Sequence, residues 1–314
     1  MEPFVEKRRA LRFDHGPLNI FTILTLVGVV IVAFLYFTDT RELLGVPIWE
    51  KPLKFLISGA IYTATLSWFY SLVTRAKKAA YLFGVAIVIF LGIEIIVIAG
   101  MAASGQTSHF NVSSAFNIAI WSVMATAIAA VWGATFGVAA MLWRTNEVST
   151  LVRSGIRCGV VIALLGMGIA FTMTPPNESQ LSGAQSGDWE GIAGAHTVGA
   201  ADGGQGLPFL GWSTVAGDLR ISHFLGLHAI QVLPLFAVLI AATVSSRSAQ
   251  KALVGSFATI YVLSVLVLYF QALAGQSIVA PSNATIAWFG ASLATAISVG
   301  LVVWYRESKK TSVQ

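Results

Sequence analysis

Residues 79–102 read AAYLFGVAIVIFLGIEIIVIAGMA and contain one charged side chain, Glu94. A helix of this length extends about 36 Å, enough to cross the ~30 Å hydrocarbon core of a bilayer. Lipid offers the backbone no hydrogen-bond partner, so a spanning segment must be a helix or a strand of a closed barrel. Barrel strands are segments of about ten residues with alternating polarity, so this run predicts a transmembrane helix.

Seven further stretches have the same character. Hydrophobic residues make up 56% of the 314-residue chain and charged residues 11%, whereas soluble domains are about one quarter charged. We predict an all-α membrane protein, a single polytopic domain over residues 1–314 with eight transmembrane helices. The expected spans are residues 19–37, 52–74, 79–102, 115–143, 154–174, 221–245, 251–275 and 284–305.

Basic residues predict the orientation of these spans. All but four of the 19 lysines and arginines fall before the first span, after the last, or in alternate connections. The exceptions are Arg41, Lys51, Lys54 and Arg220. The positive-inside rule therefore places both termini in the cytoplasm. The chain's basic balance is explained by this topology, so we expect the lipid bilayer, and no nucleic acid, as its partner.

One connection, residues 175–220, is much longer than the others and lies on the face opposite the termini. Connections of this length are usually either functional or disordered. Its second half contains Gly-Gly, the segment Leu207–Leu210 and Trp212. Turn residues beside apolar side chains are typical of a folded segment, because disordered linkers tend to lack aromatic residues. A lid and a flexible loop both remain open.

Polar residues form a stripe on the sixth predicted span, in GDLRISHFLGLHAIQVLPLF (217–236). At 100° per residue, Arg220, His223, His228 and Gln231 fall within about 140° of one another and extend about 16 Å along the helix. A stripe of this kind facing lipid would be costly, so we expect it to face the interior of the bundle.

Glu94 is the second signal, because a carboxylate near the middle of a membrane costs about 2.5–3.5 kcal/mol on insertion scales and usually has a partner or a task. Glu94 and His228 are expected at similar depths below the outer face. They are our candidate catalytic pair, sharing a proton, although hydrogen bonding within the bundle alone would also account for such residues.

Four of the five histidines lie outside the membrane or in its outer half, and imidazole is a common ligand of haem iron, copper and zinc. A haem or metal held by His109 with His223 or His228 is therefore one candidate, and a quinone-like head group is another. The metal itself is not specified. Cys158 is the only cysteine, which excludes an internal disulfide, a CxxC pair and covalent haem attachment through CxxCH.

Three segments, WEKPLKF (49–55), GQTSHFN (105–111) and GDLRISHFLGLHAIQVLP (217–234), resemble those of a family of uncharacterised multispanning bacterial inner-membrane proteins. The resemblance runs over most of the chain. It implies a location in the bacterial inner membrane and carries no activity, cofactor or site residue with it.

The leading functional hypothesis is a redox-linked or ligand-binding membrane protein with an outward-facing polar cavity. His109, His223, His228 and Gln231 would contact a haem, metal or quinone, Glu94 would exchange a proton, and Arg220 would attract an anionic group. The first alternative is a proton-coupled transporter of a small solute, with Lys54 and Arg220 as substrate anchors. The second is a structural or assembly subunit without chemistry. Whether the protein is an enzyme is not determined by the sequence.

Overall fold

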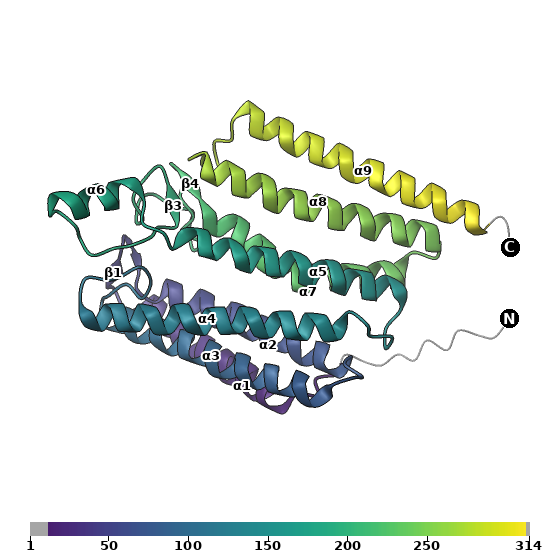
Figure 1. Cartoon of the computed structure of the whole chain (residues 1–314), viewed down its shortest axis with the longest axis horizontal. Helices are drawn as coiled ribbons and strands as arrows, with labels where there is room; N and C mark the ends of the chain where they lie inside the picture. Colours follow the sequence, from purple (N-terminus) through teal and green to yellow (C-terminus); the bar gives the residue numbers. More distant parts are fainter. Residues whose placement is uncertain (1–11, 312–314) are drawn as a thin grey trace.

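A computed structural model describes residues 12–311, and apart from two short strand pairs its regular elements are helices (Figure 1). Ordered along the chain, the eight long helices are α1 (Gly16–Thr38), α2 (Glu50–Ser71), α3 (Lys77–Ala103), α4 (Ala115–Leu142), α5 (Thr150–Ile169), α7 (Leu219–Thr243), α8 (Arg247–Leu273) and α9 (Asn283–Thr311). The predicted spans match these helices to within a few residues at most ends, and α9 extends six residues beyond residue 305.

Side-chain caps define where several of these helices begin. Ser114, Ser149 and Ser246 each accept a hydrogen bond from a backbone N–H in the first turn of α4, α5 and α8, respectively. Asp218 does the same for α7, accepting from the N–H of Arg220. These hydroxyl and carboxylate caps satisfy donors that the first turn leaves free.

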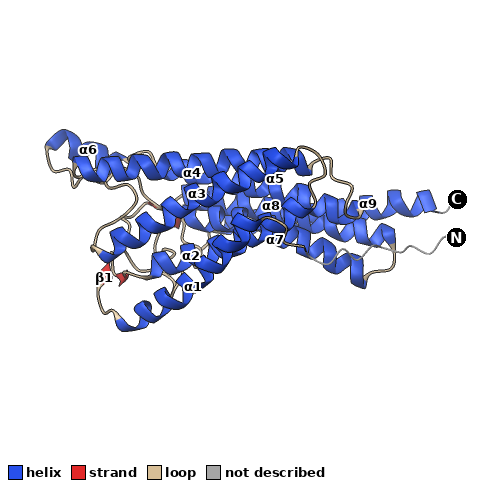
Figure 2. Ribbon diagram, turned by 90° about the horizontal axis from the view of Figure 1, so that it is seen from below, coloured by secondary structure: helices blue, strands red, loops and turns tan. Residues whose placement is uncertain are grey.

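The long helices form two groups, one of α1–α4 and one of α5, α7, α8 and α9 (Figure 1). A core of buried apolar residues from α1 to α5 joins the groups, with Ile230 of α7 packed into it. α1 begins and α9 ends at one end of the molecule, the terminal end. Figure 2 shows α6 and β1 at the opposite end, which we call the loop end.

Helices α5 and α7 approach through their backbones. A Cβ atom on Gly166 would lie 2.5 Å from the backbone of Gly226, and one on Gly159 would lie 2.6 Å from the carbonyl oxygen of Ala229. Small residues permit this approach, which is how helices associate where lipid provides no hydrophobic driving force.

Seven of the helices within the described residues are long and apolar enough to cross a membrane. This fits a helical membrane protein. The remaining predicted span, at α2, has sufficient length but is less apolar. Its first turns carry Glu50, Lys51 and Lys54, and its remainder contains several hydroxyl residues. It packs against α1 and α3, and more than half of its residues are buried.

The long connection is folded. The segment between α5 and α7, residues 170–218, contains a 3₁₀ turn (Ala170–Met173), the short helix α6 (Glu178–Ser186) and an antiparallel pair of strands, β3 (Thr197–Val198) and β4 (Gly217–Asp218). A second hairpin pairs β1 (Glu42–Leu43) with β2 (Val46–Pro47) between α1 and α2. Between β3 and β4, residues 205–214 form a turn closed by backbone hydrogen bonds between Leu207 and Trp212 and between Gln205 and Thr214. We call residues 205–214 the lid.

Candidate functional site

An ion pair on α2 holds the lid against the helices. Lys54 Nζ lies 2.7 Å from Glu50 Oε1 and donates a 3.0 Å hydrogen bond to the carbonyl oxygen of Leu210 in the lid. Glu50 is only 4% exposed. Lys54, which the sequence analysis proposed as a substrate anchor, is therefore engaged within the protein.

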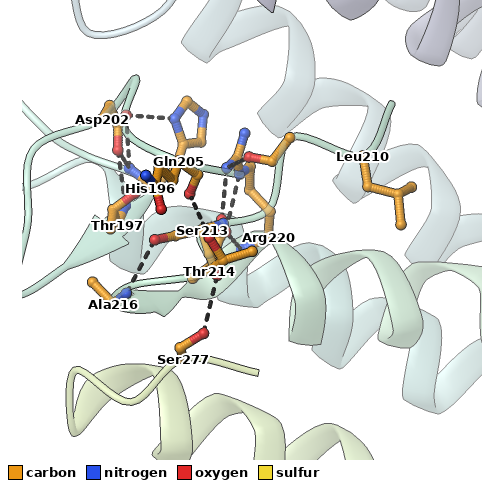
Figure 3. A network of polar contacts seen from close by, with 12 residues as sticks. His196, Thr197, Asp202, Gln205, Leu210, Ser213, Thr214, Ala216, Arg220 and Ser277 are labelled. Atoms are coloured by element: carbon orange, nitrogen blue, oxygen red, sulfur yellow. Dashed lines mark hydrogen bonds and ion pairs between the residues drawn. The ribbon is translucent and has the colours of Figure 1, made fainter. Parts of the chain in front are cut away.

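A second ion pair holds the lid from α7 (Figure 3). Arg220 donates from Nε to Asp218 Oδ1 at 2.9 Å and from Nη2 to Oδ2 at 2.6 Å, and Nη2 also donates to the carbonyl oxygen of Gly211. Asp218 is 1% exposed and accepts in addition from the N–H of Ser213. The expected role of Arg220 in attracting an anionic ligand does not fit this geometry, because a buried carboxylate already pairs with the guanidinium.

His196 and Asp202 form a half-buried pair beside the lid (Figure 3). His196 Nδ1 lies 2.6 Å from Asp202 Oδ2, and the backbone N–H groups of His196 and Thr197 donate to the same carboxylate. Burial raises the pKa of Asp202, but these donors outweigh burial and hold it well below its usual range. Burial lowers the pKa of His196, so this imidazole is neutral at pH 7 and donates from Nδ1.

His109 lies in the connection between α3 and α4 and is surrounded by aromatic rings. Its ring centroid is 5.4 Å from that of Trp121, 6.1 Å from Phe55 and 6.1 Å from Phe110. Burial, together with the positive charge of Lys51, holds the pKa of His109 well below its usual value. The imidazole is therefore neutral, with Nδ1 within hydrogen-bonding distance of the Ser108 hydroxyl.

Glu94 is 2% exposed in the middle of α3, and its Oε1 has no hydrogen-bond partner among the described residues. The charge that acts on it is that of Lys51, in the first turn of α2. Lys51 in turn lies within electrostatic range of Arg220 and Asp202. Over residues 12–309, Lys51 forms no hydrogen bond or ion pair of its own. Buried Glu94 and half-buried Lys51 are thus two ionisable groups without a hydrogen-bond partner among the described residues.

The remaining residues of the predicted stripe divide between two environments. His223 Nδ1 lies 2.7 Å from the carbonyl oxygen of Gly166 on α5. His228 Nδ1 lies 3.2 Å from Gln231 Oε1 on its own helix. Within the described residues no hydrogen bond or ion pair joins Glu94 to His228, so the structure does not bring the two members of the predicted catalytic pair together.

The donor set does not fit a metal centre. In the part of the chain that the structure describes, no three His, Cys, Asp or Glu side chains are grouped so that they could hold a metal ion. A haem shared by His109 and a histidine of α7 is not supported either, because the rings recorded around His109 are those of Phe55, Phe110 and Trp121, and none belongs to α7.

Comparison of the chain with protein-family models, with curated proteins and with solved structures found no match. The site is therefore interpreted from its own geometry.

Sequence reasoning assigned Lys51 to the outer surface and did not identify Asp218 or the His196–Asp202 pair. A signal for Asp218 was present, since Asp directly before a helical segment is a preferred N-cap. The electrostatic interaction between Lys51 and Glu94 had no such signal, because it depends on how α2 packs against α3.

Proposed function

We propose that this chain is a bacterial inner-membrane protein with eight spans and both termini in the cytoplasm. The even number of long helices places the start of α1 and the end of α9 at the same end. Basic residues gather there: Arg12, Arg75, Lys77, Lys78, Arg144, Arg153, Arg157, Arg247, Lys251, Arg306 and Lys309. Lys7, Arg8 and Arg9 lie outside the described residues, as does the side chain of Lys310. This bias supports a cytoplasmic terminal end, and the resemblance of residues 49–55, 105–111 and 217–234 supports a bacterial membrane.

The proposed activity is the binding of a small oxygen-bearing molecule, coupled to exchange of a proton, at the outer polar cluster. This cluster comprises Lys51, Glu94, His109, His196 and Asp202. The observation that carries the proposal is that buried Glu94 and half-buried Lys51 lie on different helices and lack hydrogen-bond partners within the described residues. Buried ionisable groups without structural partners mark binding or proton-transfer sites in membrane proteins.

Charge balance explains how ligand and proton would be linked. Near Lys51, the ion pairs Lys54–Glu50 and Arg220–Asp218 are each neutral. The charge of Lys51 is balanced by Asp202, because His196 is neutral. The protonation of Glu94 therefore sets the net charge of the region. An anionic oxygen bound at Lys51 would repel an ionised Glu94 and so favour proton uptake.

Two ligand classes share the required oxygen acceptor. A small carboxylate would bind Lys51 as an anion. A quinone would accept a hydrogen bond from Lys51 at a carbonyl oxygen. Aromatic rings around His109, from Phe55 and Trp121, would stack on a quinone ring.

Transport across the membrane has less support. Two buried polar contacts in the terminal half join uncharged groups: the 2.5 Å contact between Tyr62 and Thr135 and the bond from Ser67 to Asn19. Along the described spans, the ionisable groups named above lie towards the loop end. A binding site reached from one side accounts for this asymmetry.

Ligand-induced thermal stabilisation tests the proposal. Purified protein would be melted in detergent with lactate or with ubiquinone-1, at pH 6 and at pH 8. At 100 times the Kd a bound ligand stabilises by about 2.7 kcal/mol, so a shift in Tm is expected for one of the two probes. Lys51→Met should abolish the shift, and Glu94→Gln should retain it but remove its pH dependence.

Lys77→Met is the matched control, because Lys77 is exposed at the terminal end. A shift with lactate alone would identify a carboxylate site, and a shift with ubiquinone-1 alone a quinone site. No shift with either probe, or an undiminished shift in Lys51→Met, would refute the proposal.

A further inference from the structure

His228 and Gln231 lie about one turn apart on α7, and each leaves one buried nitrogen without a partner among the described residues. Their only mutual contact is the 3.2 Å approach of His228 Nδ1 to Gln231 Oε1. Because an amide oxygen only accepts, we assign the imidazole proton to Nδ1. The Nε2 atom of His228 is then an acceptor and the Nε2 group of Gln231 a donor. Together they present one acceptor and one donor.

This pair borders the apolar flank of α7. Gln231 is 7% exposed, whereas Phe224, Val232, Leu235 and Leu239 on neighbouring positions are all exposed. The ring of Phe224 lies 4.4 Å from that of His228, centroid to centroid, and covers it from the loop end. The imidazole of His228 therefore lies against an exposed aromatic side chain of the apolar flank.

The position of His228 and Gln231 along α7 determines which hydrogen-bond partners can reach them. His228 is nine residues beyond Leu219, the first residue of α7, or about 14 Å along the helix axis. In the proposed topology this lies within hydrocarbon, where neither water nor lipid tails supply partners. Tyr62 and Thr135, by contrast, are buried in the bundle and hydrogen-bond to each other.

We propose that His228 and Gln231 bind the head group of a membrane-soluble molecule that carries a hydroxyl or carbonyl oxygen. Its chain would lie along the exposed apolar flank of α7, and its head group would reach the two nitrogens when the ring of Phe224 turns aside. Gln231 would donate a hydrogen bond to a carbonyl oxygen of the head group, and His228 would accept one from a hydroxyl of a head group that carries it. This site does not rest on the function proposed for Lys51 and Glu94.

The experiment uses the full chain in detergent with two probes, decylubiquinone and palmitic acid, and measures binding by quenching of protein fluorescence or by displacement of a labelled analogue. We expect saturable binding of at least one probe to the wild type. The double variant His228→Leu/Gln231→Leu should bind that probe at least tenfold more weakly. Gln271→Leu is the control, because Gln271 is also buried and also has one unpartnered atom, Oε1, but lies on α8.

Stability of the ligand-free protein separates loss of the site from loss of the fold. Replacing both partners of a hydrogen bond by apolar groups of similar shape is nearly neutral or stabilising, so the double variant should melt at the same temperature as the wild type or higher. Lys51→Met should bind the probe as the wild type does, which separates this site from the outer polar cluster. Absence of saturable binding of both probes, or binding by the double variant within twofold of wild type, would overturn the proposal.

Discussion

Lys54 Nζ donates a 3.0 Å hydrogen bond to the carbonyl oxygen of Leu210, 156 residues further along the chain. Together with the bond from Arg220 to the carbonyl oxygen of Gly211, it ties the lid to both helix groups. A Cβ on Gly211 would lie 3.0 Å from Glu50 Oε1, and its φ of +63° is in the region that favours glycine. The lid is therefore fixed by its backbone, and its attachment depends on two cations.

Lys54→Met should loosen the lid. The change removes the bond to Leu210 and leaves the buried carboxylate of Glu50 without its cation, and a loss of 1–2 kcal/mol raises an open population roughly 5–30-fold. Hydrogen exchange at the amides of Leu207 and Thr214, which close the lid turn, measures this opening. Lys77→Met should exchange as the wild type does, and unchanged protection in Lys54→Met would show that Arg220 alone holds the lid.

The segment 196–202, beside the lid, should open as the pH falls below about 6.5. The pKa of His196 is lowered in the closed structure, so an open state with an ordinary histidine pKa near 6.5 binds more protons below that pH. The stability that His196 gives the closed state is therefore complete above pH 6.5 and is lost as the pH falls towards the lowered pKa. The ratio of open to closed protein rises by at most about tenfold per pH unit. The lowered pKa of Asp202 acts in the same direction in more acidic solution.

Protection factors at residues 196–202, corrected for intrinsic exchange, measure this dependence between pH 5.5 and 7.5. His196→Asn keeps a donor near Asp202 but does not titrate, so its protection should be flat over this range. An equally steep dependence in His196→Asn would assign the effect to another group.

Gly166→Ala should destabilise the contact between α5 and α7. The added Cβ would lie 2.5 Å from the backbone of Gly226 and Leu227, and neither helix can yield without shifting. Overpacking of this kind costs about 1–3 kcal/mol, which thermal unfolding in detergent would detect as a lower Tm. Gly168→Ala is the control on the same helix, since its nearest neighbour, Trp132 Cζ2, would be 3.9 Å away. An equal Tm for both variants would contradict the close approach.

Cysteine labelling tests the orientation. In a Cys158→Ser background, Ser186→Cys places an exposed thiol on α6 at the loop end, and Lys77→Cys places one at the terminal end. A membrane-impermeant maleimide added to intact spheroplasts should label position 186 and should label position 77 only after permeabilisation. The reverse pattern would invert the proposed topology.

The helices could be predicted from the sequence because hydrophobicity acts locally along the chain. A run such as residues 79–102 must form a helix in lipid whatever its neighbours are, and Ser114 or Asp218 indicates where a helix begins. A helix was predicted correctly at α2, although α2 is not among the seven helices apolar enough to cross a membrane; its packing against α1 and α3 is not visible in the sequence periodicity. Glu94 stood out for a similarly local reason, as a charge within an apolar run.

Which ionisable side chains interact with one another was decided by the tertiary structure. Glu94 was expected beside His228, but Lys51 is the charge that acts on it. Arg220 was expected to attract an anionic ligand, but it pairs with Asp218. Depth along a helix can be counted from sequence, whereas the helix that lies opposite depends on contacts such as that of Gly166 with Gly226, which join segments distant in the chain. The sequence by itself determined which segments are helical and which residues are costly to bury. Only packing decided which of those residues meet, because the order of helices in the bundle is set by the shapes of their surfaces.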